Sequence, residues 1–306
     1  MTNQTASNQA SELKGKFSPV ILTCCAAARQ FIDKEVVFGG VGVSFLAVAI
    51  SKLRYTPCLI MVTEAGYVDF AGVSSMGSPA DNHGAIGASL HQGLFDTFRD
   101  LQSGHINAAC LGLAQVDKFG NANVSYVNPN IRMNGSGGGC DIASSAGRVV
   151  YVVKYAARTF QEKLDYITNP GYLDGSPDAR KKAGLVGGGP ACLVTDRGIF
   201  RFHEKTHEMY LAEVFPWQDE KDIESIKADV PWDLKVADNL KIIEPPNQGE
   251  IDAIALMDPG KAYLEESMMN RPVALISMSG RRDLNAYREI AEIFRAKFQQ
   301  AKDYLL

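Results

Sequence analysis

The sequence predicts an α/β fold with an open, mostly parallel sheet flanked by helices. Strand and helix signals alternate through the first half of the chain in the order strand, helix, strand, helix, strand. The clearest strand is the continuous apolar run 58–63, which the turn residues 64–66 interrupt at once. After about Asp165 short strands stand close together around the turn 196–198, which predicts additional antiparallel strands in the C-terminal half.

The first half of the chain supplies the parallel part of the predicted sheet. A helix with Pro19 in its first turn is expected at 18–34, an apolar helix follows 39–44 and ends near Ser51, and an amphipathic helix is expected at 92–103. The expected strands are 36–38, 58–63, 106–113 and 149–153. We interpret run 58–63 as a central strand that is covered on both faces. The segment 70–87 is rich in Gly, Ser and Pro, which predicts a long functional surface loop.

The second half of the chain adds shorter elements. The expected strands are 191–195, 199–202 and 209–214, and the expected helix is 219–228. Pro245 and Pro246 predict an exposed joint. Residues 283–306 predict a long amphipathic helix that ends the chain.

Composition excludes several classes of protein. The chain of 306 residues is 46% hydrophobic and 22% charged, as in ordinary globular proteins. A net charge of −4 argues against a nucleic-acid binder, which needs a basic face. No apolar stretch reaches the roughly 20 residues that span a bilayer, and the polar N-terminus lacks the apolar core of a signal peptide. Six cysteines without a C-x-x-C pair indicate reduced thiols, so we expect a cytoplasmic protein.

Glu64 is the strongest candidate for a catalytic residue. It stands where the apolar run 58–63 ends, and Gly66 then allows the backbone to turn sharply. In open α/β sheets ligands bind beyond the carboxyl ends of the strands. Glu64 therefore suits a nucleophile or an acid/base group held on a rigid element. The alternative is a strand-end carboxylate that only caps the next turn.

Two glycine-rich segments are candidates for close approach of the backbone to a ligand. Gly39-Gly40-Val41-Gly42 could place N–H groups against a phosphate, but it does not match G-x-G-x-x-G, and close packing at a strand–helix corner is the favoured interpretation. The run 135–139 is a stronger ligand candidate, with a flexible loop as the alternative. The turn 117–121 and its asparagines are explained by local hydrogen bonds alone.

The sequence predicts no metal site. His203 and His207 are four residues apart, but the surrounding aromatic residues favour strands over a metal-binding helix. Cys140 follows the glycine run directly. It is either a reactive thiol or, as is commoner for cysteine, a small buried hydrophobe.

Taken in order, the motifs resemble those of the small (B) subunits of glutaconate CoA-transferases, which are family I CoA-transferases. The matching segments are Gly40-Val41-Gly42, Thr63–Asp69, Ala114–Asn123, Gly135–Gly138, Asp165–Tyr172, Val194–Gly198 and Asp258–Gly260. Ala65 replaces the serine of the family's Glu-Ser-Gly segment, and Cys140 stands where the family has an asparagine, unless Gly139 shifts the register. The polar N-terminus 1–17 is expected to be frayed. The resemblance covers a CoA-transferase-like domain at 18–265 and leaves an extension at 266–306 unexplained.

The resemblance implies a covalent mechanism. Glu64 would attack an acyl-CoA thioester and then carry CoA as a glutamyl thioester, while Gly137 and Gly138 would stabilise the oxyanions. Gly40, Gly42 and Gln115 would bind CoA. Coenzyme A is a substrate here, and no permanently bound metal or redox cofactor is required.

The resemblance also implies partners and alternatives. A larger A-type subunit would complete the active site in an A2B2 assembly, and the acceptor would be a carboxylic acid, with a dicarboxylate such as glutaconate as the expected class. Related two-subunit proteins act on acyl-CoA as decarboxylases or carbon–carbon bond hydrolases, but in those the small-subunit glutamate is replaced. A non-catalytic CoA-binding subunit is the remaining alternative.

Overall fold

The computed structural model describes residues 13–70, 82–128, 131–133, 135–258, 261 and 263–264. The C-terminal helix predicted at 283–306 and the Pro-Gly dipeptide at 259–260 lie outside these residues, as do most of the N-terminal segment 1–17 and most of the loop predicted at 70–87.

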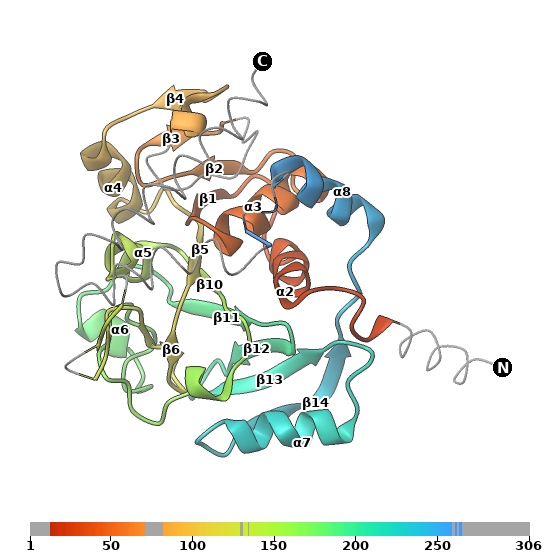
Figure 1. Cartoon of the computed structure of the whole chain (residues 1–306). Helices are drawn as coiled ribbons and strands as arrows, with labels where there is room; N and C mark the ends of the chain where they lie inside the picture. Colours follow the sequence, from red (N-terminus) through yellow and green to blue (C-terminus); the bar gives the residue numbers. More distant parts are fainter. Residues whose placement is uncertain are drawn as a thin grey trace.

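A mixed, mostly parallel sheet runs through the molecule (Figure 1). In the described residues its ten strands lie in the order β14-β13-β12-β11-β10-β5-β1-β2-β3-β4. The strands are β1 (Val36–Gly39), β2 (Ile60–Val62), β3 (Tyr67–Val68), β4 (Leu90–His91), β5 (Ala108–Gly112), β10 (Val149–Val152), β11 (Pro190–Val194), β12 (Gly198–Phe202), β13 (Met209–Val214) and β14 (Lys235–Ile242). From β2 through β1, β5 and β10 to β11 all neighbours are parallel, which confirms the predicted fold class.

Antiparallel strands flank this parallel part on both sides. β12 pairs antiparallel with β11 and β13, as predicted from the closely spaced strands around the turn 196–198. On the other side β3 pairs antiparallel with β2 and β4. Two small hairpins lie outside the main sheet. They pair β6 (Gln115–Val116) with β7 (Ala122–Asn123), and β8 (Tyr126–Val127) with β9 (Ile131–Arg132).

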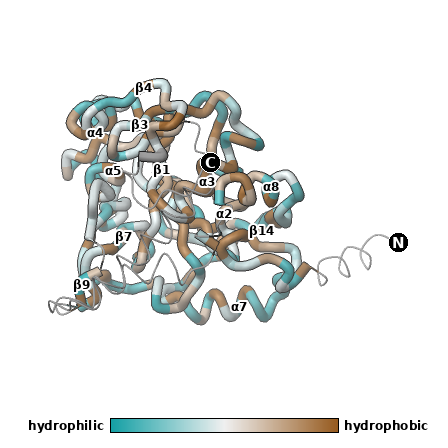
Figure 2. Tube along the Cα trace, turned by 45° about the horizontal axis from the view of Figure 1, so that its top comes forward, coloured by the Kyte–Doolittle hydropathy of each residue, from teal (hydrophilic) through white to brown (hydrophobic). Residues whose placement is uncertain are grey.

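The helices cover both faces of the sheet. They are α2 (Pro19–Ala28), α3 (Val43–Arg54), α4 (Leu94–Gln102), α5 (Gly139–Ser145), α6 (Ala179–Lys182), α7 (Glu220–Asp229) and α8 (Gln248–Met257), with 3₁₀ turns at Asn82–Ala85 and Ala157–Thr159. Residues of α2, α3 and α8 join one apolar core, and residues of α4, α5 and α7 join a second. Figure 2 shows α2 and α3 as mostly apolar and α7 as mixed, which fits two buried helices and one half-exposed helix.

The strands divide their side chains between these two cores. Val37 belongs to the first core and Phe38 to the second, and Val150 and Tyr151 alternate in the same way. Successive side chains of a strand point to opposite faces, so each parallel strand needs apolar residues at every position. This requirement is why the strands appear in the sequence as continuous apolar runs.

Three expectations need correction. β2 lies third from one end of the sheet, between β1 and β3, rather than at its centre, although Met61 and Val62 are buried on opposite faces as expected. The first helix ends at Ala28 rather than near Lys34; Lys34, with φ +70°, lies in the turn that leads into β1. Pro246 is buried between β14 and α8 rather than exposed.

In the described residues no helix is long and apolar enough to cross a membrane.

Candidate active site

A three-residue turn holds Glu64 at the end of β2. Thr63 and Tyr67 are hydrogen-bonded across the hairpin, and the N–H of Gly66 donates to the carbonyl of Thr63 at 3.0 Å. Gly66 has φ +86°, and a Cβ there would lie 2.0 Å from the carbonyl oxygen of Gln92. Three-residue hairpin loops of this kind need a residue with positive φ, so glycine is required. The turn fixes the backbone of Glu64 relative to the N-terminus of α4.

The glycine run brings a backbone donor to Glu64. The N–H of Gly138 donates to Glu64 Oε1 at 2.8 Å. A Cβ on Gly138 would lie 2.4 Å from the same oxygen, whereas one on Gly137 would lie 3.7 Å from it. Gly138 therefore has to be glycine because of the contact with Glu64, and Gly137 because its φ of +48° disfavours other residues. The structure thus brings together three of the predicted site residues.

Phe98 closes this arrangement on one side. The ring of Phe98 on α4 lies 5.9 Å, centroid to centroid, from that of Phe38 in an edge-to-face pair. A Cβ on Gly138 would lie 2.4 Å from Phe98 Cζ, so the ring contacts the glycine backbone. Sequence reasoning missed Phe98, because it is one apolar residue among several in an amphipathic helix. The only signal was its place in the helix that follows the turn carrying Glu64.

Gly40 and Gly42 lie at the same edge of the sheet as Glu64. β1 and β2 are parallel with Phe38 beside Val62, so Gly40 and Glu64 both follow the strand ends. Gly42 precedes α3 with φ +73° and ψ −133°, and a Cβ on Gly40 would lie 3.2 Å from the carbonyl oxygen of Cys110. These contacts agree with close packing at the strand–helix corner.

Gln115 belongs to a buried polar network. Its amide nitrogen donates to Asp165 Oδ2 at 2.8 Å, and its amide oxygen accepts from Asn123 Nδ2 at 2.6 Å. Asn121 is held in the same way, donating to Asp117 and to the carbonyl of Leu173. Both polar ends of the Gln115 side chain are therefore engaged with protein groups. Local hydrogen bonds do not explain Asn121 alone, because it bonds to Asp117 within the turn and also to Leu173, which is 52 residues away in the chain.

The remaining candidates lie elsewhere or carry no ligand set. In the described part of the chain no group of three or more His, Cys, Asp or Glu side chains is placed to hold a metal ion. His207 stacks on Tyr172, with ring centroids 4.3 Å apart. Cys140 is exposed at the start of α5, and partial burial, followed by the charge of Asp141, raises the pKa of its thiol.

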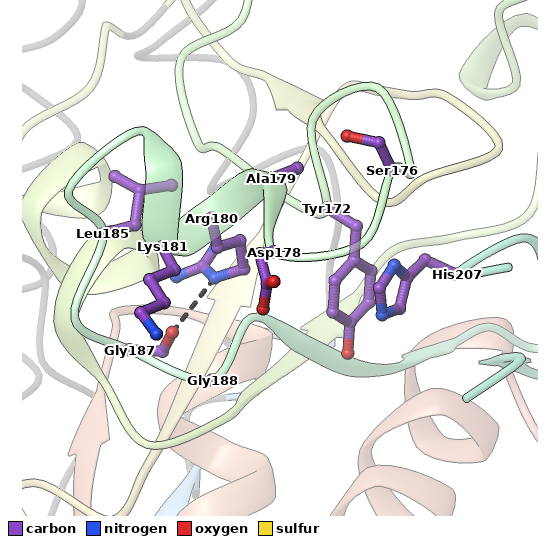
Figure 3. A pocket seen from close by; sticks show the side chains of 10 residues that line it. All are labelled: Tyr172, Ser176, Asp178, Ala179, Arg180, Lys181, Leu185, Gly187, Gly188 and His207. Atoms are coloured by element: carbon purple, nitrogen blue, oxygen red, sulfur yellow. Dashed lines mark hydrogen bonds between the residues drawn. The ribbon is translucent and has the colours of Figure 1, made fainter. Parts of the chain in front are cut away.

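A cavity of about 250 Å³ lies beside α6 (Figure 3), and Glu64 is not among the residues that line it. Its lining includes Tyr172, Arg180, Lys181 and His207.

Comparison with known proteins supports one family. The model of the family described as Coenzyme A transferase matches residues 24–224. The chain is 32% identical to the B subunit of glutaconate CoA-transferase from Acidaminococcus fermentans over 249 residues, which cover 78% of this chain and 91% of that protein. It is 31% identical to the B subunit of 3-oxoadipate CoA-transferase from Pseudomonas knackmussii, covering 76% and 90% of the two chains.

Solved structures show the same architecture. The crystal structure of glutaconate coenzyme A-transferase from Acidaminococcus fermentans aligns with a TM-score of 0.73 at 28% identity, covering 81% of this chain and 98% of that chain. The decarboxylase AibA/AibB aligns with a TM-score of 0.66 at 21% identity, covering 80% and 97%, which shows a shared fold alone. The fold, the motif order and the matches over most of the sequence agree, and this chain belongs to the coenzyme A transferase family.

Proposed function

We propose that this chain is the subunit of a CoA-transferase that carries the catalytic carboxylate, and that it moves CoA between an acyl-CoA and a carboxylic acid. The single observation that carries the proposal is the 2.8 Å hydrogen bond from the N–H of Gly138 to Glu64 Oε1. It joins the strand-end carboxylate to the glycine loop, the two features that stand out in the sequence as candidates for catalysis.

The proposed reaction runs through a glutamyl-CoA thioester. The Glu64 carboxylate attacks the thioester carbonyl, and the CoA thiolate leaves to give an acyl–glutamyl anhydride. The thiolate then attacks the Glu64 carbonyl carbon, and the first acid leaves as its carboxylate. The acceptor acid reverses both steps, so no oxidant, metal or external base is consumed.

The Gly138 N–H suits the step at the glutamyl carbonyl. When the thiolate attacks Glu64, negative charge develops on a carboxyl oxygen of Glu64 itself, where the donor already lies. A backbone donor aimed at a developing oxyanion typically contributes about 2.7–4 kcal/mol. Gly137 is the second proposed donor, because it is exposed and a Cβ on it would lie 3.7 Å from Glu64 Oε1. Gly40, Gly42 and Gln115 remain predicted CoA contacts.

The partner and the acid are also proposals. The two relatives at 31–32% identity are both named as B subunits, which supports a larger A-type partner and the expected A2B2 assembly. Their names refer to glutaconate and 3-oxoadipate, both dicarboxylic acids, which supports a dicarboxylic substrate. The partly exposed Glu64 leaves room for a second chain to complete the pocket.

An exchange assay tests the proposal. The chain is purified with its A-type partner, and CoA transfer between acyl-CoA donors and glutaconate, 3-oxoadipate or acetate is followed by mass spectrometry. Glu64→Gln should abolish transfer, whereas Glu204→Gln, which changes an exposed glutamate, should leave it intact. Decarboxylated or carbon-chain-cleaved products without CoA exchange would instead support the decarboxylase or hydrolase alternative. CoA binding without any turnover would support a non-catalytic role.

A further inference from the structure

Arg180 on α6 is buried and fully engaged with backbone carbonyls. Its side chain is 8% exposed. Nε donates to Gly187, Nη1 donates to Pro170 and Gly171, and Nη2 donates to Ala143 and Ser144, all at 2.8–3.1 Å. A guanidinium has five N–H groups, so each of them is used.

These contacts show that the cavity beside Arg180 is not an anion site built on this residue. A phosphate or carboxylate in the cavity would have to displace a carbonyl, because no N–H of Arg180 points into free space. Burial lowers the pKa of Arg180, which reflects the cost of holding this cation away from water. Arg180 therefore has a structural role, in which it links separate segments of the backbone. Figure 3 shows one of these links, the hydrogen bond to Gly187.

The link reaches the helix that starts at the proposed oxyanion donor. Ala143 and Ser144 belong to α5, and Gly138 is the residue that caps the N-terminus of this helix. The carbonyls in the last turn of a helix have no partner within it, and Arg180 supplies two of them with donors.

Backbone contacts bring a second segment to the same end of α5. The N–H of Gly187 donates to the carbonyl of Ser144 at 2.8 Å. A Cβ on Gly187 would lie 2.3 Å from the carbonyl oxygen of Ala146, so the two backbones touch. Arg180 also holds Pro170 and Gly171, which directly follow Asn169 beside Gly139. Arg180 thus joins α5 to two other segments, at 170–171 and at Gly187.

We propose that Arg180 is a positioning residue for the transfer reaction, which fixes α5 so that the Gly138 N–H stays directed at Glu64. The inference rests on the proposed function of Glu64. Lysine cannot replace Arg180, because its three N–H donors on one nitrogen are fewer than the five carbonyls that Arg180 bonds from three nitrogens. A misplacement of about 1 Å at a reacting group can lower a rate by about 10²-fold.

Steady-state kinetics of the assembled enzyme separate positioning from binding. Arg180→Lys should lower kcat by roughly 10-fold or more and leave KM for acyl-CoA within about twofold. The reason is that the contact it disturbs, from the Gly138 N–H to Glu64, acts in the transition state. The matched control is Lys181→Ala, which removes the neighbouring exposed cation. This variant should change neither kcat nor KM. If Arg180→Lys fails to assemble, Gly187→Ala disturbs the same end of α5. This variant should likewise show a lower kcat with little change in KM. A wild-type kcat in the assembled variant would overturn the proposal.

Hydrogen exchange gives a readout that does not depend on activity. In Arg180→Lys, amide exchange should rise in peptides covering 135–146 and stay unchanged in α7. An equal rise throughout the protein would mean a general loss of stability and would overturn the positioning role. If wild-type enzyme forms no covalent adduct at Glu64, the proposed function fails. If the adduct forms but Arg180→Lys changes neither kcat nor exchange, only this inference fails.

Discussion

The backbone N–H of Gly138 and the carboxylate of Glu64 form a 2.8 Å hydrogen bond between segments 74 residues apart in the chain. The hairpin turn after β2 fixes one partner, and the start of α5 fixes the other. In the proposed reaction Glu64 acts first as a nucleophile and then as an electrophilic carbonyl, and the donor helps mainly in the second step, when the oxygen of Glu64 itself takes up charge.

The first prediction concerns the shape of the glycine loop. Gly138→Ala should lower kcat by roughly 10²-fold, because its Cβ would lie 2.4 Å from Glu64 Oε1 and from Phe98 Cζ. Both are the movable ends of side chains, so the protein should still fold with Glu64 displaced. Gly112→Ala, whose Cβ would be 4.0 Å from the nearest atom, is the control. Equal kcat values in the two variants would show that the loop has another role.

The second prediction concerns the length of the nucleophile. Glu64→Asp shortens the side chain by one methylene and should break the hydrogen bond to Gly138. We expect a loss of kcat on the order of 10²-fold or more with little change in melting temperature, since Glu64 is only partly buried. Transfer assays and thermal denaturation of the same samples measure both. A large drop in melting temperature would instead indicate that Glu64 serves the fold.

The third prediction concerns Phe98. Phe98→Ala removes the edge-to-face partner of Phe38 and the ring that contacts Gly138. Because the ring is only partly buried, the free energy of unfolding should fall by about 2 kcal/mol, less than for a fully buried phenylalanine. Urea denaturation measures this change. Phe98→Leu should recover most of the stability, and no recovery would argue against a packing role.

The fourth prediction concerns the buried ion pair that joins α2 to α8. Arg29 Nη2 lies 2.7 Å from Glu250 Oε2, and the Glu250 side chain is 0% exposed. Glu250→Ala should cost about 3–5 kcal/mol of unfolding free energy, because it leaves the Arg29 charge without its carboxylate. Removing the exposed carboxylate of Glu224 should cost less than about 1 kcal/mol. Similar losses in both variants would contradict a special role for the buried pair.

The fifth prediction concerns Cys140. Partial burial, followed by the charge of Asp141, raises the pKa of its thiol, so little reactive thiolate exists at neutral pH. Alkylation of the Cys140 peptide by iodoacetamide should be slow at pH 7 and should accelerate about tenfold per pH unit up to the raised pKa. A plateau below about pH 8.5, the ordinary pKa of a free thiol, would contradict the shift. Cys140→Ser should retain CoA transfer.

Much of the parallel sheet could be predicted from the sequence because its strands are buried on both faces. Runs such as 149–153 contain apolar residues at every position, which few other structures require. β14 was missed because half of its residues are polar and none of them is buried. α8 was missed because the proline pair just before it was interpreted as an exposed joint. The central place assigned to β2 was wrong, because nothing in its composition shows that β3 and β4 end the sheet.

The candidate site was predictable only in part. The strand-end position of Glu64 follows from local pattern, but its contact with Gly138 depends on tertiary structure and was inferred from family resemblance. Arg180 could not be found from sequence at all. It stands in the run Ala179–Lys182, which looks like a solvated basic helix, although one of its cations is buried among carbonyls.

The expectation that this chain is half of an enzyme gives a further test of assembly. The motifs that resemble family I transferases occur once in this chain, so the chain alone should exchange no CoA between acids. Adding the A-type partner should restore transfer, and gel filtration should show both chains in one complex. Sustained turnover by the chain alone, with the partner shown to be absent, would refute the need for a second chain.

Covalent trapping at Glu64 tests the central claim most directly. The assembled enzyme is incubated with acyl-CoA and then with borohydride, which reduces a glutamyl thioester to an alcohol, and the modified peptide is mapped by mass spectrometry. We predict reduction at Glu64, dependent on acyl-CoA and absent from Glu64→Gln. Reduction at another residue, or full transfer activity without any adduct at Glu64, would contradict the proposed mechanism.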